Sequence, residues 1–124
     1  MTRTILVVED NDICRDALEV VLAKLPKYAA RVVATAEQAL EYLDGEDICA
    51  LVTDLHLGRM DGFDLIASVR SRPQHASLPI LVISGDSDPG TPARLERIGA
   101  NAYFIKPYSP AEVCSKLEQL VHAY

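Results

Sequence analysis

Short apolar runs alternate with longer amphipathic segments along the whole chain. Each apolar run is too short for a helix and is bounded by polar or turn-forming residues, which is typical of a strand. Several runs are apolar throughout, as expected for strands that are buried on both faces of a sheet. The alternation therefore predicts an α/β fold in which helices cover both faces of a parallel sheet. The expected strands are residues 4–8, 30–34, 48–53, 80–84 and 102–105.

The spacing of apolar residues after the first strand predicts a helix. Ile13, Ala17, Val21 and Leu25 recur at helical spacing, so we expect them to share one face of this helix. Proline cannot continue a helix, and Pro26 is therefore expected to end it.

Capping signals mark the later helices. Thr35 and Gln38 form the pattern of a capping box, in which each side chain satisfies a backbone amide that the helix start leaves unpaired. A third helix is expected at about residues 63–71 and a fourth at about residues 92–98. Gly99 is the expected left-handed residue that ends the fourth helix. His75 and His122 are expected at the surface.

Composition limits the classes of function. At 124 residues and 49% hydrophobic, the chain is expected to form one domain, residues 1–124, with a single core. Its apolar runs fall far short of the roughly 20 residues of a membrane span, and its first residues lack the features of a secretory signal. We therefore expect a cytoplasmic protein without membrane contact. A net charge of −6 offers no basic surface for nucleic acid. Cys14, Cys49 and Cys114, odd in number and widely spaced, are expected as reduced thiols.

Polar side chains follow the predicted strands at the edge where such sheets bind ligands, beyond the carboxyl ends of the strands. Any single acid there could be a turn former, and Asp10 or Asn11 could simply cap the first helix. The joint pattern nevertheless favours a site, because several functional groups converge on one edge. These groups are Glu9 and Asp10 after the first strand, Asp54 after the third, Ser84 at the end of the fourth, and Lys106 before Pro107 after the fifth.

Electrostatics indicates what such a site would bind. Two carboxylates about 5 Å apart repel by roughly 3 kcal/mol at an effective dielectric constant of about 20, and one lysine cannot neutralise three acids. A hard divalent cation such as Mg²⁺ can, and it commonly brings phosphate oxygens with it. A carboxylate can act as a nucleophile and form an aspartyl phosphate. Asp54, which follows the most apolar central strand, is the best candidate for that nucleophile.

Four segments carry a resemblance to a known family: ILVVEDND, LVTDLHLGRMDGFDLI, PILVISG and IGANAYFIKPYSPAEV. Their order and spacing resemble the receiver domain of two-component response regulators over nearly the whole chain. The resemblance implies a flavodoxin-like doubly wound fold, with five parallel strands in the order 2-1-3-4-5 and helices on both faces.

The resemblance also assigns roles to individual residues. It implies that Asp54 is the phosphoacceptor, with Mg²⁺ or Mn²⁺ as the metal. It implies a cis peptide bond between Lys106 and Pro107. The implied metal ligands are Glu9, Asp10, Asp54 and the backbone carbonyl of His56; the implied phosphoryl contacts are Lys106 and Ser84; the implied switch residues are Ser84 and Tyr103; and the residues implied to tune dephosphorylation are His56 and Asp86.

The function implied is that of a signalling domain that catalyses only its own phosphorylation and dephosphorylation. A histidine kinase or a histidine phosphotransfer protein would supply the phosphoryl group. The face formed by the fourth helix, fifth strand and fifth helix would then change and control an unknown downstream protein, and a homodimer is possible.

Other interpretations remain open at this point. The chain could be an interaction module that no longer accepts phosphate, or a Mg²⁺-dependent phosphohydrolase. The hydrolase is disfavoured because His56 stands where a second acid would be needed, and a flavin site is disfavoured because no phosphate-binding loop follows the first strand. Tyr103 could be an ordinary packed aromatic, and His56 and Asp86 could be solvated loop residues.

Overall fold

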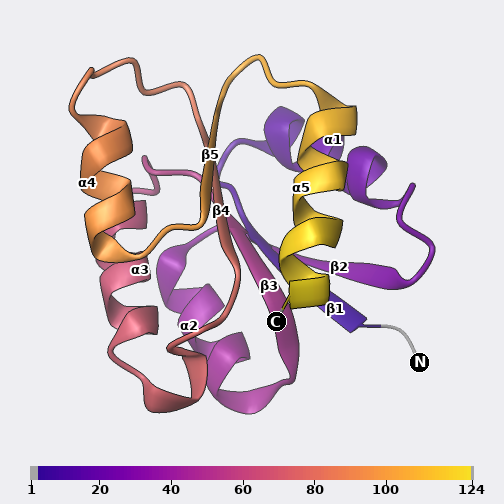
Figure 1. Ribbon diagram of the computed structural model, residues 1–124, viewed down its shortest axis with the longest axis horizontal. Coiled ribbons are helices and arrows are strands. Elements are labelled where there is room, and N and C mark those ends of the chain that lie inside the picture. Colours follow the sequence, from indigo (N-terminus) through magenta and orange to yellow (C-terminus); the bar gives the residue numbers. More distant parts are fainter. Residues whose placement is uncertain (1–2, 124) are drawn as a thin grey trace.

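The computed structural model describes residues 3–123. Its core is a five-stranded parallel sheet in the order β2-β1-β3-β4-β5, which confirms the predicted fold class and strand order (Figure 1). Three of the predicted strands have the predicted bounds, whereas β2 lies slightly earlier in the chain than expected. The strands are β1 (Arg3–Val8), β2 (Tyr28–Val33), β3 (Ile48–Thr53), β4 (Ile80–Ser84) and β5 (Ala102–Ile105).

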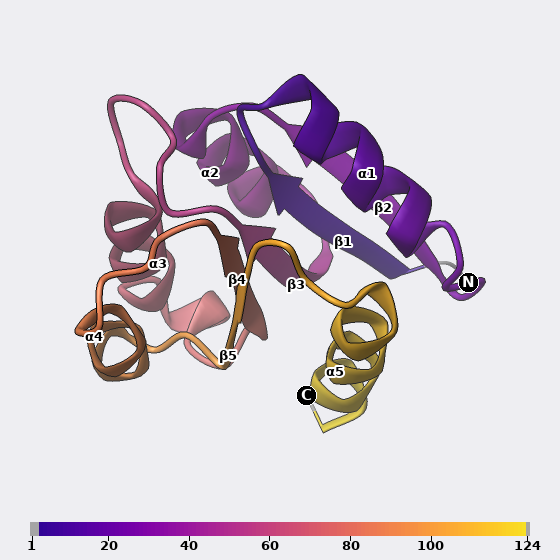
Figure 2. The ribbon, with the colours of Figure 1, turned by 90° about the horizontal axis from the view of Figure 1, so that it is seen from above.

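Helices cover both faces of the sheet. Figures 1 and 2 show α1 and α5 on one face, and α2, α3 and α4 on the other. Two clusters of buried side chains fill the space between the sheet and these two helical layers. All six residues of β3 are buried, as expected for the central strand. The helices are α1 (Asp12–Leu22), α2 (Ala36–Gly45), α3 (Gly62–Arg70), α4 (Thr91–Ile98) and α5 (Pro110–Ala123), and a short 3₁₀ turn, η1, spans Pro73–His75.

The buried face of α1 differs from the prediction. Val21 is buried as predicted, and so is Leu25, which lies just beyond the helix, but Ile13 is 80% exposed and Ala17 is also exposed. Leu18 and Leu22 complete the buried face. Leu18 and Leu22 recur at helical spacing and join Leu25 in the apolar cluster beneath α1, so the buried face is turned away from Ile13. The helix also ends at Leu22, before Pro26.

Most local signals are confirmed, and one position is corrected. The hydroxyl of Thr35 accepts from the Gln38 amide at 3.1 Å and the Gln38 side chain accepts from the Thr35 amide at 3.2 Å, so the capping box is present. Gly99 has φ +104° and ends α4 in the left-handed region. His75, expected at the surface, is buried, because η1 places its Nε2 atom 3.1 Å from the Leu43 carbonyl oxygen.

Two expectations from composition can be compared with the structure. All three cysteines are free thiols, as predicted. Within residues 3–123, no helix combines the length and the apolar character needed to cross a membrane.

Candidate functional site

Glu9, Asp54 and Lys106 meet at the carboxyl edge of the sheet. The Asp54 amide donates to the Val8 carbonyl at 3.1 Å, so Asp54 extends the pairing between β3 and β1 by one residue. Glu9 is 1% exposed and Asp54 is 8% exposed. The Lys106 Nζ atom donates to Glu9 Oε1 at 2.6 Å and to Asp54 Oδ2 at 2.8 Å. Three of the side chains that sequence placed at strand ends therefore form one cluster.

The surroundings of Asp54 keep its carboxylate ionised. Burial alone would raise the pKa of Asp54, but hydrogen bonds from Lys106, the Ser84 hydroxyl and the Leu55 amide outweigh burial and hold the pKa below its ordinary value. The Leu55 amide donates to Asp54 Oδ1 at 2.5 Å, whereas Lys106 pairs with Oδ2. Each carboxylate oxygen therefore has a different partner, and the group is oriented as well as charged.

The pKa values of Glu9 and Lys106 are both raised in this site, but for different reasons. Burial raises the pKa of Glu9, and the hydrogen bonds from Lys106 and the Asn11 amide offset this only in part. Burial would lower the pKa of Lys106, but its hydrogen bonds with Asp54 and Glu9 raise that pKa well above its ordinary value. One ammonium thus serves two buried carboxylates, which leaves the site short of positive charge.

Asp10 lies outside this cluster. It is exposed, and the neighbouring Asn11 caps α1 by accepting from the Cys14 amide at 3.0 Å. The capping alternative is therefore correct for Asn11. Within residues 3–123, no three His, Cys, Asp or Glu side chains are placed so that they could already hold a metal ion. The pair Glu9 and Asp54 is preassembled around a cation, and Asp10 is the residue that would have to turn toward it.

The remaining predicted residues surround the cluster. Ser84 is fully buried at the end of β4, and its Oγ atom accepts from the Asp86 amide at 3.3 Å. The Tyr103 hydroxyl donates to the Asp86 carbonyl at 2.6 Å. His56 Nε2 lies 3.4 Å from Asp86 Oδ2. The peptide bond between Lys106 and Pro107 is cis, in agreement with the resemblance.

Gly62 is a site residue that the sequence interpretation missed. A Cβ atom on Gly62 would lie 2.2 Å from the Asp54 carbonyl oxygen and 2.7 Å from the Leu55 Cα atom. The Gly62 amide also donates to the Leu55 carbonyl at 2.8 Å, so the start of α3 packs directly on the backbone of the acidic site. Asp61, which caps α3 by accepting from the Asp64 amide at 2.8 Å, is the sequence signal that could have drawn attention to this turn.

Comparison with known families decides the classification. The family model of the response regulator receiver domain matches residues 5–118. The chain belongs to this family. The receiver domain is 30% identical over 115 residues to the chemotaxis protein CheY1 of Helicobacter pylori. The aligned region covers 92% of this chain and 93% of the relative. The resemblance inferred from sequence is therefore confirmed.

Solved structures agree with this classification. The receiver domain is similar to the crystal structure of a putative response regulator from Chloroflexus aurantiacus, with 31% identity, a TM-score of 0.92 and coverage of 98% of this chain and 99% of that one. It is also similar to the receiver domain of the sensor histidine kinase PA1611 from Pseudomonas aeruginosa, with 25% identity, a TM-score of 0.88 and coverage of 98% and 99%. In the PA1611 structure a magnesium ion is coordinated in the active site cleft.

Family membership narrows the functions considered above. Receiver domains are signalling domains of two-component systems and not conventional enzymes, so the phosphohydrolase interpretation is set aside. The family role is that of a phosphoacceptor placed between a histidine kinase and a downstream effector.

Proposed function

We propose that this receiver domain accepts a phosphoryl group on Asp54 from a histidine kinase or a histidine phosphotransfer protein. The observation that carries the proposal is the placement of the Asp54 carboxylate, which is buried and hydrogen-bonded on both oxygens, with the Lys106 ammonium 2.8 Å from Oδ2. A positioned anionic oxygen beside a fixed positive charge is what in-line attack on phosphorus requires.

The residues have distinct roles in the transfer. We propose that Oδ2, which lies 2.8 Å from the Lys106 ammonium, attacks phosphorus while the Leu55 amide holds Oδ1 in place. A new O–P bond forms as the P–N bond of the donor phosphohistidine breaks, and the electron pair leaves with the imidazole nitrogen. Lys106 stays beside the transferred oxygens and stabilises their charge, and the Ser84 hydroxyl donates to one of them. The same groups would assist hydrolysis of the aspartyl phosphate by water.

A divalent cation fits the chemistry of this site. Glu9 and Asp54 already share one cationic partner, Lys106, and carboxylate and carbonyl oxygens are the ligands that Mg²⁺ prefers. We propose Glu9, Asp10, Asp54 and the backbone carbonyl of His56 as its ligands, and Mn²⁺, which accepts similar ligands, as a substitute. When bound, the ion would supply positive charge against the phosphoryl oxygens. Asp10 would turn inward, and Lys106 would keep its contact with Asp54.

Phosphorylation would be transmitted through Ser84 and Tyr103. Once Ser84 donates to the phosphoryl group, its position beside the Asp86 amide changes. Because the Tyr103 hydroxyl binds the Asp86 carbonyl, Tyr103 would follow, and the face formed by α4, β5 and α5 would change.

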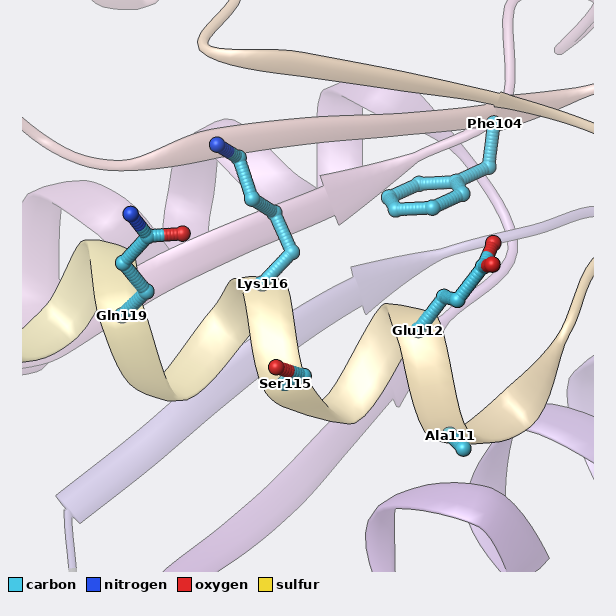
Figure 3. Close-up of a pocket in the computed structure, with 6 residues that line it drawn as sticks. All are labelled: Phe104, Ala111, Glu112, Ser115, Lys116 and Gln119. Carbon is cyan, nitrogen blue, oxygen red and sulfur yellow. The ribbon is translucent and has the colours of Figure 1, made fainter.

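The α4-β5-α5 face is the proposed contact for a downstream protein or for a second copy of the chain. On its α5 side lies a groove of about 350 Å³, and Figure 3 shows Glu112, Lys116 and Gln119 reaching from α5 toward the side of the groove that carries Phe104. Ile105, 54% exposed, adds an apolar contact on β5.

The proposed function has a direct test. Incubation of the protein with Mg²⁺ and acetyl phosphate is expected to add one labile phosphoryl group, detected by intact mass. Asp54→Asn removes the nucleophile and a chelator removes the metal, so neither sample should gain mass. An unmodified parent protein would instead favour the interaction module that no longer accepts phosphate.

His56 and Asp86 are expected to slow hydrolysis of the aspartyl phosphate. Their side chains meet across the loops that follow β3 and β4, with His56 Nε2 3.4 Å from Asp86 Oδ2. We expect this pair to limit the approach of water to Asp54. His56→Ala and Asp86→Ala should each shorten the lifetime of the phosphorylated form by about threefold or more. His122→Ala, at an exposed position near the end of α5, is the matched control. Lifetimes equal to that of the parent would refute the assignment.

A further inference from the structure

The Asp86 side chain contacts two segments of the chain, one that precedes Asp86 in the sequence and one that follows it. Its Oδ2 atom faces His56 Nε2 at 3.4 Å, in the loop that follows Asp54. Its Oδ1 atom accepts from the Thr91 hydroxyl at 3.1 Å and from the Asp88 amide at 2.8 Å. One oxygen therefore contacts the phosphoacceptor loop, and the other contacts the first residue of α4.

The Asp86 backbone contacts the two proposed switch residues. Its amide donates to Ser84 Oγ at 3.3 Å, and its carbonyl accepts from the Tyr103 hydroxyl at 2.6 Å. The carboxylate is only 15% exposed, so these contacts leave it little freedom to rotate. A shift of Ser84 must therefore move Asp86, and movement of Asp86 must strain or break its side-chain contacts.

The start of α4 is held by side chains of the preceding loop, Asp86 among them, and not by an N-cap side chain. Gly90 occupies the N-cap position and provides no side-chain cap, unlike Thr35 at α2. Thr91 is 5% exposed, and its hydroxyl finds its acceptor in Asp86. Farther along the helix, Arg94 lies over the Phe63 ring at 3.7 Å and Leu95 is buried. The later part of α4 thus has its own anchors, whereas the first turn is held by the loop before it. The Gly90 amide donates to Asp88 Oδ1 at 2.8 Å and the Thr91 amide donates to the Asp88 carbonyl at 3.1 Å, while Asp86 accepts from the Thr91 hydroxyl and from the Asp88 amide.

We propose that Asp86 acts as a clasp that couples the phosphoacceptor site to the first turn of α4. The inference rests on the proposed function for its trigger and names the connection by which that trigger reaches α4. In the unphosphorylated protein the contacts of Asp86 with Ser84 and Thr91 are all present. When the Ser84 hydroxyl moves from the Asp54 carboxylate to an oxygen of the phosphoryl group, the Asp86 amide loses its acceptor, the Asp86 carboxylate shifts, and its bond to the Thr91 hydroxyl breaks. The first turn of α4 then loosens, which alters the α4-β5-α5 face.

Amide hydrogen exchange of the α4 peptide, followed by mass spectrometry with and without acetyl phosphate and Mg²⁺, tests the clasp. Thr91→Val keeps the size of the side chain but removes the hydroxyl, and should speed exchange in the first turn of α4 by about two- to tenfold, as for the loss of one hydrogen bond. Phosphorylation should speed exchange there in the parent and add little in Thr91→Val. Thr91→Ser, which keeps the hydroxyl, should behave like the parent.

The controls separate the clasp from the function on which it rests. Thr35→Val removes a cap hydroxyl from α2 and should speed exchange there without changing the response of α4. Normal exchange of α4 in Thr91→Val, or an undiminished response to phosphorylation, would overturn the clasp. If intact mass shows no phosphorylation of the parent, the proposed function fails, and the comparison of Thr91→Val with Thr91→Ser alone then decides whether the hydroxyl holds α4.

Discussion

Replacing Lys106 with methionine is expected to slow phosphorylation of Asp54 by about 100-fold or more, the usual cost of removing one charged group from a transition-state site. The variant should also lose about 2 kcal/mol of stability near neutral pH, because it leaves two buried carboxylates without their shared partner while the edge of the site remains open to solvent. Acetyl phosphate labelling measures the first effect and urea unfolding measures the second.

The stability difference between Lys106→Met and the parent should shrink as the pH falls. In the parent, the lowered pKa of Asp54 contributes stability above its unfolded pKa that is lost as the pH falls through the folded value. The raised pKa of Lys106 contributes stability below its unfolded pKa that is lost only in strong base. The raised pKa of Glu9 acts in the opposite sense and costs stability until Glu9 is protonated. Without Lys106 the ionised forms of both carboxylates have lost their positive partner. Protonation of these carboxylates at low pH therefore removes part of the stability loss of the variant.

Lys24→Met, at an exposed position after α1, controls for the loss of a lysine. Its stability should stay within about 0.5 kcal/mol of the parent at every pH. Normal labelling of Lys106→Met, or a stability difference that grows between neutral pH and pH 5, would contradict the electrostatic account of the site.

Gly62→Ala is expected to cost about 3 kcal/mol of stability and most of the phosphorylation rate, because the new methyl group would overlap the Asp54 carbonyl oxygen. Backbone atoms cannot rotate away as a flexible side chain can, so either α3 or the backbone of the acidic site must move. Urea unfolding and the initial rate of labelling by acetyl phosphate measure the two effects.

Gly45→Ala provides a matched control at the end of α2. No atom lies within 4 Å of the Cβ position there, so this variant should be as stable as the parent or up to about 1 kcal/mol more stable. Equal behaviour of the two variants would show that the close approach of Gly62 to Asp54 has no energetic consequence.

The fold could be predicted from the sequence because its signals are local and agree with one another. The apolar run at β3 and the capping box at Thr35 and Gln38 each depend on a few neighbouring residues. The cluster of Glu9, Asp54 and Lys106 followed from one topological rule, since all three residues come directly after parallel strands.

The features that sequence missed depend on contacts between distant segments. Two apolar stripes of α1 were available, and only packing against the sheet shows that Ile13 faces solvent. The burial of His75 depends on the position of the Leu43 carbonyl, and the need for glycine at position 62 depends on the Asp54 backbone. The sequence predicted Asp10 beside the other acids. Asp10 lies in a loop, however, where its side chain can turn toward solvent, and it is exposed.

The most direct test of the central claim is the chemical position of the phosphoryl group. Reduction of the acetyl-phosphate-treated protein with borohydride converts an acyl phosphate on aspartate to homoserine, which peptide sequencing by tandem mass spectrometry can locate. The account predicts homoserine at position 54 in the parent, and none when the same protein is treated without Mg²⁺. Homoserine at Asp10 or at another acid, with Asp54 intact, would contradict it.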